Sequence, residues 1–109
     1  MKLRDYLSIP YLLEAETVET PDGGWTRRLR YPELGNFFAE HEDVETALAE
    51  LERLRITEIM RLLRRGELPP APRAPLETLD PAWLAARLGL TDLISDKLQH
   101  DVAELGLKR

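Results

Sequence analysis

Alternating charges on both sides of a glycine turn are the first feature of this sequence that could do chemistry. Residues 14–34 read EAETVETPDGGWTRRLRYPEL, with three glutamates before the Gly-Gly pair and three arginines and two aromatic residues after it. Clustered arginines and aromatic rings are typical of surfaces that bind nucleic acid. The glutamates favour a second interpretation, in which the two halves are neighbouring strands that neutralise each other.

Cysteine and histidine, the usual ligands of a structural zinc ion, are scarce in this sequence. The chain has no cysteine, so neither a disulfide nor a thiolate zinc site can form, and His41 and His100 are too few and too isolated to build a site. We therefore predict no metal site and no cofactor. The net charge is −5 over 109 residues. This charge favours a basic protein partner, because nucleic-acid affinity depends on clustered Lys and Arg.

The opening stretch predicts a β-hairpin with two different faces. Residues 11–18 and 25–31 alternate with a period of two, and PDGG between them allows the positive φ of a tight turn. The expected register gives a mainly apolar face with Tyr11, Leu13, Ala15, Thr17, Trp25, Leu29 and Tyr31. The opposite face then carries Leu12, Glu14, Glu16, Val18, Thr26, Arg28 and Arg30.

Charge pairing across the hairpin leaves little positive field for a phosphate backbone. We therefore favour a structural role for the charged face, then partner binding, and nucleic-acid contact least. Residues 36–41 (NFFAEH) predict a short third strand, in which Phe37 or Phe38 points inward. The residues expected at a partner-binding surface are Glu14, Glu16, Arg28, Arg30 and Phe38.

Residues 43–66 are predicted to form one long amphipathic helix. Asp43 is a suitable N-cap, basic residues occupy the last turns, and Gly66 suits the position after the C-terminus. At 100° per residue, one arc of about half the circumference holds the apolar positions 44, 47, 48, 51, 54, 59, 62 and 63.

Further apolar residues lie beside this arc and widen it beyond what one small sheet would cover. They are Ala49, Ile56 and Met60. Either the C-terminal segment or a second subunit must cover them, and we favour homo-oligomerisation. The expected contact residues are Ile56, Met60 and Trp83.

Four prolines within residues 67–76 mark a boundary, because proline cannot continue a helix. We predict two units, residues 1–75 and residues 76–109. Residues 69–75 make a poor interior strand, and at best an edge strand forms near residues 72–76.

The second unit is predicted to contain two helices. Asp80 and Pro81 begin a helix over residues 82–88, and Thr91 begins another that runs to about Leu105. If these helices bound DNA, the contact residues would be Arg87 and Lys97. DNA binding is disfavoured, because three aspartates in residues 91–101 oppose one lysine there. Packing on the core or across a dimer is favoured instead.

The sequence of residues 23–51, GGWTRRLRYPELGNFFAEHEDVETALAEL, resembles the HicB antitoxin family. The similar features are a glycine-tipped hairpin, an aromatic strand that ends in Pro-Glu-Leu-Gly, and an acid-rich helix start with the family's E-x-A-L pattern at 45–48. GELPPAP at 66–72 is similar to the Gly- and Pro-rich run that follows the family's helix. The resemblance covers about residues 8–75.

The resemblance implies a partial ribonuclease-H-like fold of the α+β class. It would have an antiparallel sheet of three, or four, strands packed on one long helix, with a C-terminal helical extension. Many family members neutralise HicA, a small basic toxin that cleaves messenger RNA, so the resemblance implies a HicA-like partner. We expect no enzymatic activity, because the carboxylates alternate with arginines where a nuclease site needs carboxylates that converge on two metal ions.

Alternatives to toxin neutralisation remain. One is a stand-alone homo-oligomer that kept the fold without a toxin partner. Another is an autorepressor that binds DNA through its C-terminal helices, since longer family members end in a DNA-binding module. The uncharged run over residues 6–13 contains Pro10 and is too short for a signal sequence or a membrane span. We therefore expect a cytoplasmic protein with no membrane partner.

Overall fold

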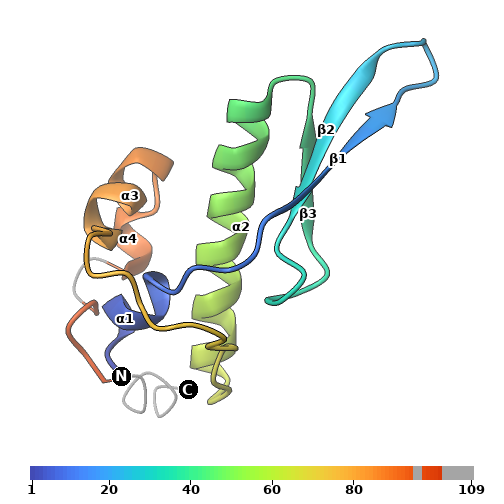
Figure 1. Ribbon diagram of the computed structural model, residues 1–109. Helices are drawn as coiled ribbons and strands as arrows, with labels where there is room; N and C mark the ends of the chain where they lie inside the picture. Colours follow the sequence, from blue (N-terminus) through green and yellow to red (C-terminus); the bar gives the residue numbers. More distant parts are fainter. Residues whose placement is uncertain (95–96, 102–109) are drawn as a thin grey trace.

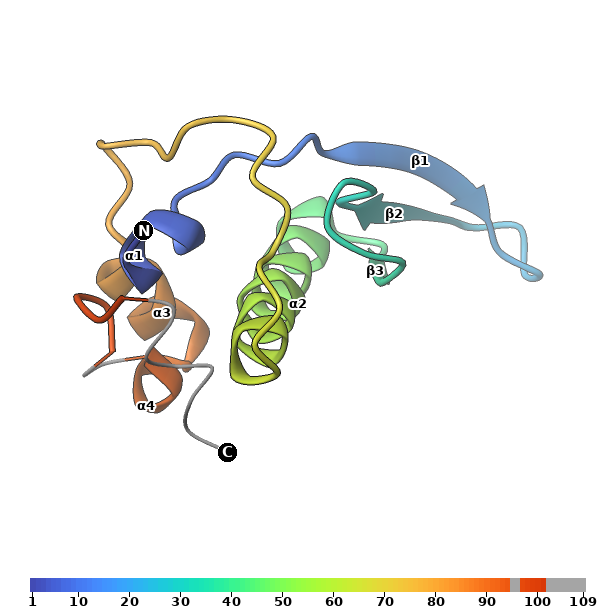
Figure 2. The same ribbon diagram turned by 90° about the horizontal axis from the view of Figure 1, so that it is seen from below.

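The computed structural model describes residues 1–94 and 97–101 and has an α+β fold built in layers. The elements are α1 (Leu3–Leu7), β1 (Glu14–Glu19), β2 (Trp25–Arg30), β3 (Phe38–His41), α2 (Val44–Arg64), α3 (Pro81–Leu88) and α4 (Thr91–Ile94). The sheet lies on one side of α2, and α1, α3 and α4 lie on the other side (Figures 1 and 2). The predicted fold class, an antiparallel sheet packed on one long helix with C-terminal helices, is confirmed.

The sheet has the order β1-β2-β3, and both strand pairs are antiparallel. The hairpin closes with Gly23 at φ 87°, in the left-handed region that favours glycine. Glu14 lies opposite Arg30 and Glu16 lies opposite Arg28, so the predicted hairpin register is confirmed. This register turns Leu29 towards α2, where its side chain is buried.

The predicted apolar face of the hairpin is only partly buried. Leu29 and Tyr31 are in the core, but Trp25 is 55% exposed and Leu13 is half exposed. The far end of the hairpin extends past the N-terminal end of α2 (Figure 1). Trp25 starts β2 at this end, so it has no helix to pack against.

Helix α2 matches the predicted helix closely at both ends. The Asp43 carboxylate accepts a hydrogen bond from the Thr46 N–H at 3.2 Å, and Gly66 follows the helix with φ 77°. The buried positions of the helix are Ala47, Leu51, Arg55, Ile56, Ile59, Met60 and Leu63. Val44 and Leu48, expected on the inner arc, are exposed. The buried arc is wider in the second half of α2, because other helices pack on α2 there in addition to the sheet.

Ile56 and Met60 are each 1% exposed within a single chain. The prediction that a second subunit covers them is therefore wrong, and the alternative, cover by the C-terminal segment, is correct in part. They share a hydrophobic cluster with residues of α1, α3 and α4, which are Leu3, Leu7, Ala85, Leu88 and Ile94. Helix α1, which was not predicted, is part of this cover.

The proline-rich connection follows an irregular path over the rest of the fold. The Tyr11 hydroxyl donates to the Pro70 carbonyl at 2.7 Å, and the Leu76 N–H donates to the Ser8 carbonyl at 2.8 Å. Residues 72–76 form no strand, so the sheet has three strands within the described part of the chain. Side chains from both sides of residue 75 share the hydrophobic cluster, and the division at that residue stays a prediction.

Helix α3 begins and ends as predicted. The Asp80 carboxylate accepts from the Ala82 N–H at 3.1 Å, and Gly89 ends the helix with φ 73°. None of the helices over residues 1–94 and 97–101 has the length and apolar composition needed to cross a membrane.

The predicted second C-terminal helix is much shorter than expected. α4 ends at Ile94, and residues 97–100 form a turn, so the expected continuation is wrong over this stretch; residues 102–105 lie outside the described part of the chain. The backbone N–H groups of Leu3 and Arg4 donate, each at 3.0 Å, to the carbonyls of His100 and Leu98. This turn therefore satisfies N–H groups at the start of α1, which a continuing helix could not do.

Candidate functional site

The outer face of the sheet, which points away from α2, brings together the side chains predicted to bind a partner. They are Glu14, Glu16, Arg28, Arg30 and Phe38. Arg30 forms ion pairs with Glu14 at 3.1 Å and with Glu16 at 3.3 Å. Arg28 pairs with Glu16 at 3.3 Å, and its guanidinium carbon lies 4.8 Å from the centre of the half-exposed Phe38 ring. The predicted charge pairing across the hairpin is confirmed.

Glu40 is an additional member of this face. It lies opposite Arg28 in the register and pairs with that guanidinium at 2.8 Å. Hydrogen bonds from the Thr26 hydroxyl at 2.9 Å and from Arg28 lower the pKa of the Glu40 carboxyl. The sequence signal for Glu40 was its position two residues after Phe38, which puts both on one face of β3.

Charge reversal on this face tests whether Glu40 contributes to stability in addition to the ion pairs across the hairpin. Arg28→Glu with Arg30→Glu should lower the melting temperature, because like charges then face each other across the sheet. Adding Glu14→Arg and Glu16→Arg should restore only part of the loss, since Glu40 still faces the glutamate introduced at position 28. Adding Glu40→Arg should complete the recovery in thermal unfolding. Equal melting temperatures with and without Glu40→Arg would show that Glu40 does not contribute to the stability of this face.

A buried polar network centred on α2 connects Tyr31, next to the sheet, with α1 on the other side of the helix. The side chain of Arg55 is only 5% exposed, and it pairs with Glu52 at 2.8 Å and donates to the Leu7 carbonyl at 2.9 Å. The Tyr31 hydroxyl donates to the Glu52 carboxylate. These residues border a cavity of about 160 Å³ that Tyr11 and Ser8 also line. Because the Arg55 guanidinium has its ion-pair and hydrogen-bond partners within the chain, we interpret the network as structural.

The helical period contained a signal for the buried arginine. Arg55 follows Leu51 by four residues and precedes Ile59 by four, which places it in the middle of the apolar arc. An i,i+3 spacing such as that of Glu52 and Arg55 is typical of exposed ion pairs on a helix, so the spacing alone does not reveal the burial.

Burial raises the pKa of the Tyr11 hydroxyl from 10.0 to about 12, although Arg55 opposes this shift. Burial and the neighbouring Glu52 carboxylate also raise the pKa of Tyr31. In both cases the neutral phenol is favoured in the folded protein, because its ionised form would lose hydration.

These raised pKa values predict loss of stability in alkaline solution. Unfolded tyrosine ionises near pH 10, so the stabilisation is fully present below that pH and is lost as pH rises through about 12. Urea unfolding measured at increasing pH should show this decline. The decline should be shallower in Tyr31→Phe than in the wild type, and an unchanged slope would contradict the assignment.

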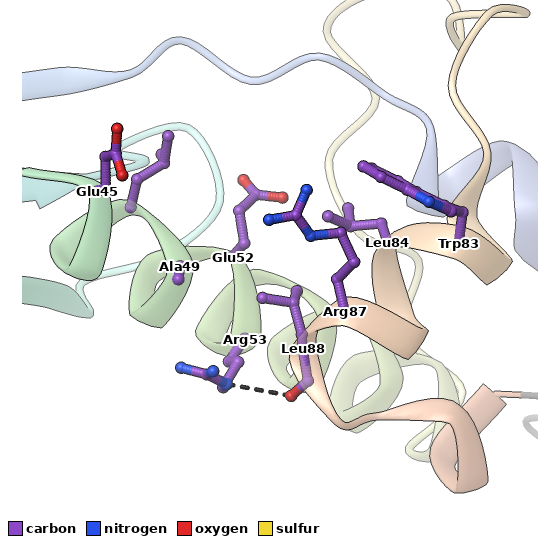
Figure 3. Close-up of a pocket in the computed structure, with 9 residues that line it drawn as sticks. Glu45, Ala49, Glu52, Arg53, Trp83, Leu84, Arg87 and Leu88 are labelled. Carbon is purple, nitrogen blue, oxygen red and sulfur yellow. Dashed lines mark hydrogen bonds between the residues drawn. The ribbon is translucent and has the colours of Figure 1, made fainter.

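A groove of about 420 Å³ lies between α2 and α3 (Figure 3). The α2 wall has Glu45, Leu48, Ala49, Glu52 and Arg53, and the α3 wall has Trp83, Leu84, Arg87 and Leu88. Trp83 is 58% exposed, and the guanidinium carbon of Arg87 lies 5.0 Å from its ring centre. The Arg53 Nε donates to the Leu88 carbonyl at 3.1 Å and joins the two walls.

The residues predicted to contact a second subunit or DNA lie in different parts of the structure. Trp83 is exposed at the groove, whereas Ile56 and Met60 are in the core. Arg87 lines the groove, whereas Lys97, which was expected on the second C-terminal helix, belongs to the turn at 97–100. Sequence reasoning missed the groove because it placed Leu48 on the inner arc of α2.

The described residues contain no group of three or more His, Asp or Glu side chains that could hold a metal ion. Comparison with known proteins found no matching family model, no similar curated protein and no similar solved structure.

Proposed function

We propose that this chain is a HicB-like antitoxin that binds and neutralises a small basic RNA-cleaving toxin. The observation that supports the proposal most is the arrangement of the segment that resembles the family. Residues 23–51 form β2, β3 and the first turns of α2, which are antiparallel strands followed directly by the long helix across them. A small antiparallel sheet with one long helix across it is the arrangement that the resemblance implies.

The outer sheet face is the surface that we assign to the toxin. It has three carboxylates against two guanidinium groups, all on adjacent strands, and Phe38 is half exposed among them. A basic partner can share these carboxylates with the arginines, while the Phe38 ring provides an apolar contact. The acidic excess of the whole chain would favour the encounter with such a partner.

Gene context and coexpression test the proposal. A neighbouring reading frame should encode a short basic protein that arrests growth when expressed alone and not when expressed with this chain. The two purified proteins should elute together, and failure to do so would contradict the proposal.

Variants of the outer face test the binding surface. Phe38→Ala should weaken toxin binding at least tenfold, which corresponds to about 1.4 kcal/mol. Trp25→Ala is the matched control, since Trp25 is an exposed aromatic residue of the same sheet and is the first residue of β2, next to the hairpin turn. Isothermal titration calorimetry measures both, and equal affinities would place the toxin on another surface.

The alternatives have unequal support. An autorepressor needs a recognition helix, and α4 has four residues, Thr91–Ile94, followed by a turn at 97–100. A stand-alone homo-oligomer is favoured by one observation, the exposed Trp83 beside an apolar groove. That surface can be tested without any toxin.

A further inference from the structure

The groove between α2 and α3 is a concave surface that exposes apolar side chains. Trp83 is one of the most exposed large apolar side chains in the described chain, and Val44 and Leu48 are exposed one turn apart on α2. Leu48 and Ala49 line the groove opposite Trp83, and alanine leaves room for a large side chain to approach the helix. Tryptophan is enriched where proteins bind each other and concentrates binding energy there.

Both walls of the groove carry a charge that the chain itself leaves unpaired. Arg53 pairs with Glu50 at 3.2 Å and Glu52 pairs with Arg55 at 2.8 Å, so these charges are already compensated. Over the residues that the structure describes, Glu45 on the α2 wall and Arg87 on the α3 wall have no ion-pair partner within 4 Å. The two walls therefore offer opposite charges.

We infer that a second copy of this chain occupies the groove, in a two-fold dimer that places the α3 wall of each copy on the α2 wall of the other. A two-fold interface must be self-complementary, because the same patch is used twice. In this arrangement Trp83 of each copy packs on Leu48 and Ala49 of its partner, and Arg87 of each copy meets Glu45 of the other. A uniformly basic partner would neutralise Glu45 and be repelled by Arg87.

The first test measures the oligomeric state of the full chain alone by analytical ultracentrifugation. The wild type should form dimers, and Trp83→Ala should weaken dimerisation at least about thirtyfold. Trp25→Ala, at the other exposed tryptophan, should leave dimerisation unchanged. Both substitutions are at exposed sites, so circular dichroism should show an intact fold. A wild type that stays monomeric at millimolar concentration, or a Trp83→Ala variant that dimerises normally, would overturn the inference.

The second test uses the charges and identifies contacts between copies. Glu45→Arg and Arg87→Glu should each weaken self-association, because like charges then meet twice at the two-fold interface. Mixing the two single variants should give a heterodimer, since both contacts between a Glu45→Arg chain and an Arg87→Glu chain join opposite charges. Failure of the mixture to associate more strongly than either variant alone would overturn the pairing.

Tryptophan fluorescence reports on the groove directly, because the chain has only two tryptophans. In Trp25→Phe, the Trp83 emission should shift to the red on dilution as the dimer dissociates. In Trp83→Phe, the Trp25 emission should not depend on concentration. A Trp83 shift that occurs only with added basic toxin would assign the groove to that toxin and overturn the dimer. These measurements on the chain alone do not depend on whether the antitoxin proposal is correct.

Discussion

Leu51→Asp is expected to destabilise the protein severely, whereas Leu48→Asp is expected to change its stability little. Leu51 is 0% exposed and belongs to the same hydrophobic cluster as Leu29 and Ala39 of the sheet. Aspartate at this position would bury a carboxylate, and the arginine one turn along the same face, Arg55, is already held by Glu52 and by the Leu7 carbonyl. The expected loss is about 4 kcal/mol or more, against a total stability of about 5–15 kcal/mol for a domain of this kind.

Leu48 is the matched control, because it lies on the same helix, has the same side chain and is 40% exposed. Urea unfolding followed by circular dichroism measures both variants. If Leu51→Asp lowers the stability no more than Leu48→Asp does, the orientation of α2 described above is wrong.

Arg55→Met is expected to destabilise the protein by about 3–5 kcal/mol, although it adds an apolar side chain to an apolar environment. The substitution leaves the Glu52 carboxylate, whose side chain is 17% exposed, without its cation, and it leaves the Leu7 carbonyl without its donor. A double variant with Glu52→Gln should recover much of the loss, because no unpaired charge then remains in the core.

Arg61→Met is the matched control for the buried pair. Arg61 pairs with Glu58 at the same i,i+3 spacing on the same helix, but its side chain is 48% exposed. Exposed pairs contribute little, so the midpoint of chemical unfolding should stay close to that of the wild type. Equal effects of Arg55→Met and Arg61→Met would show that burial does not decide the strength of these pairs.

Local patterns were sufficient for the hairpin, α2 and α3. The register of β1 and β2 follows from the period of two and from a turn that needs glycine, and both signals lie within a few residues. The caps Asp43 and Asp80 and the glycines that follow the helices act over one turn of backbone, so the ends of α2 and α3 were predicted correctly. For the same reason, the paired charges of the outer sheet face could be named in advance.

Contacts between distant segments could not be predicted in this way. Whether Ile56 and Met60 face another subunit or the same chain depends on α1, α3 and α4, which pack on α2 from far away in the sequence. The length of α4 depends on hydrogen bonds from α1 to the turn at 97–100. Arg55 can be buried because its guanidinium is bonded to the Glu52 carboxylate and to the carbonyl of Leu7, which is distant in the sequence.

The amino-acid sequence by itself determined the class of the fold, the hairpin register and the charged outer face, because each depends on side-chain alternation and on caps a few residues apart. Only the tertiary structure decided which side of α2 is covered and where the groove with Trp83 remains open. Those outcomes depend on how far the sheet and the other helices extend along α2. That extent is set only when these layers pack together.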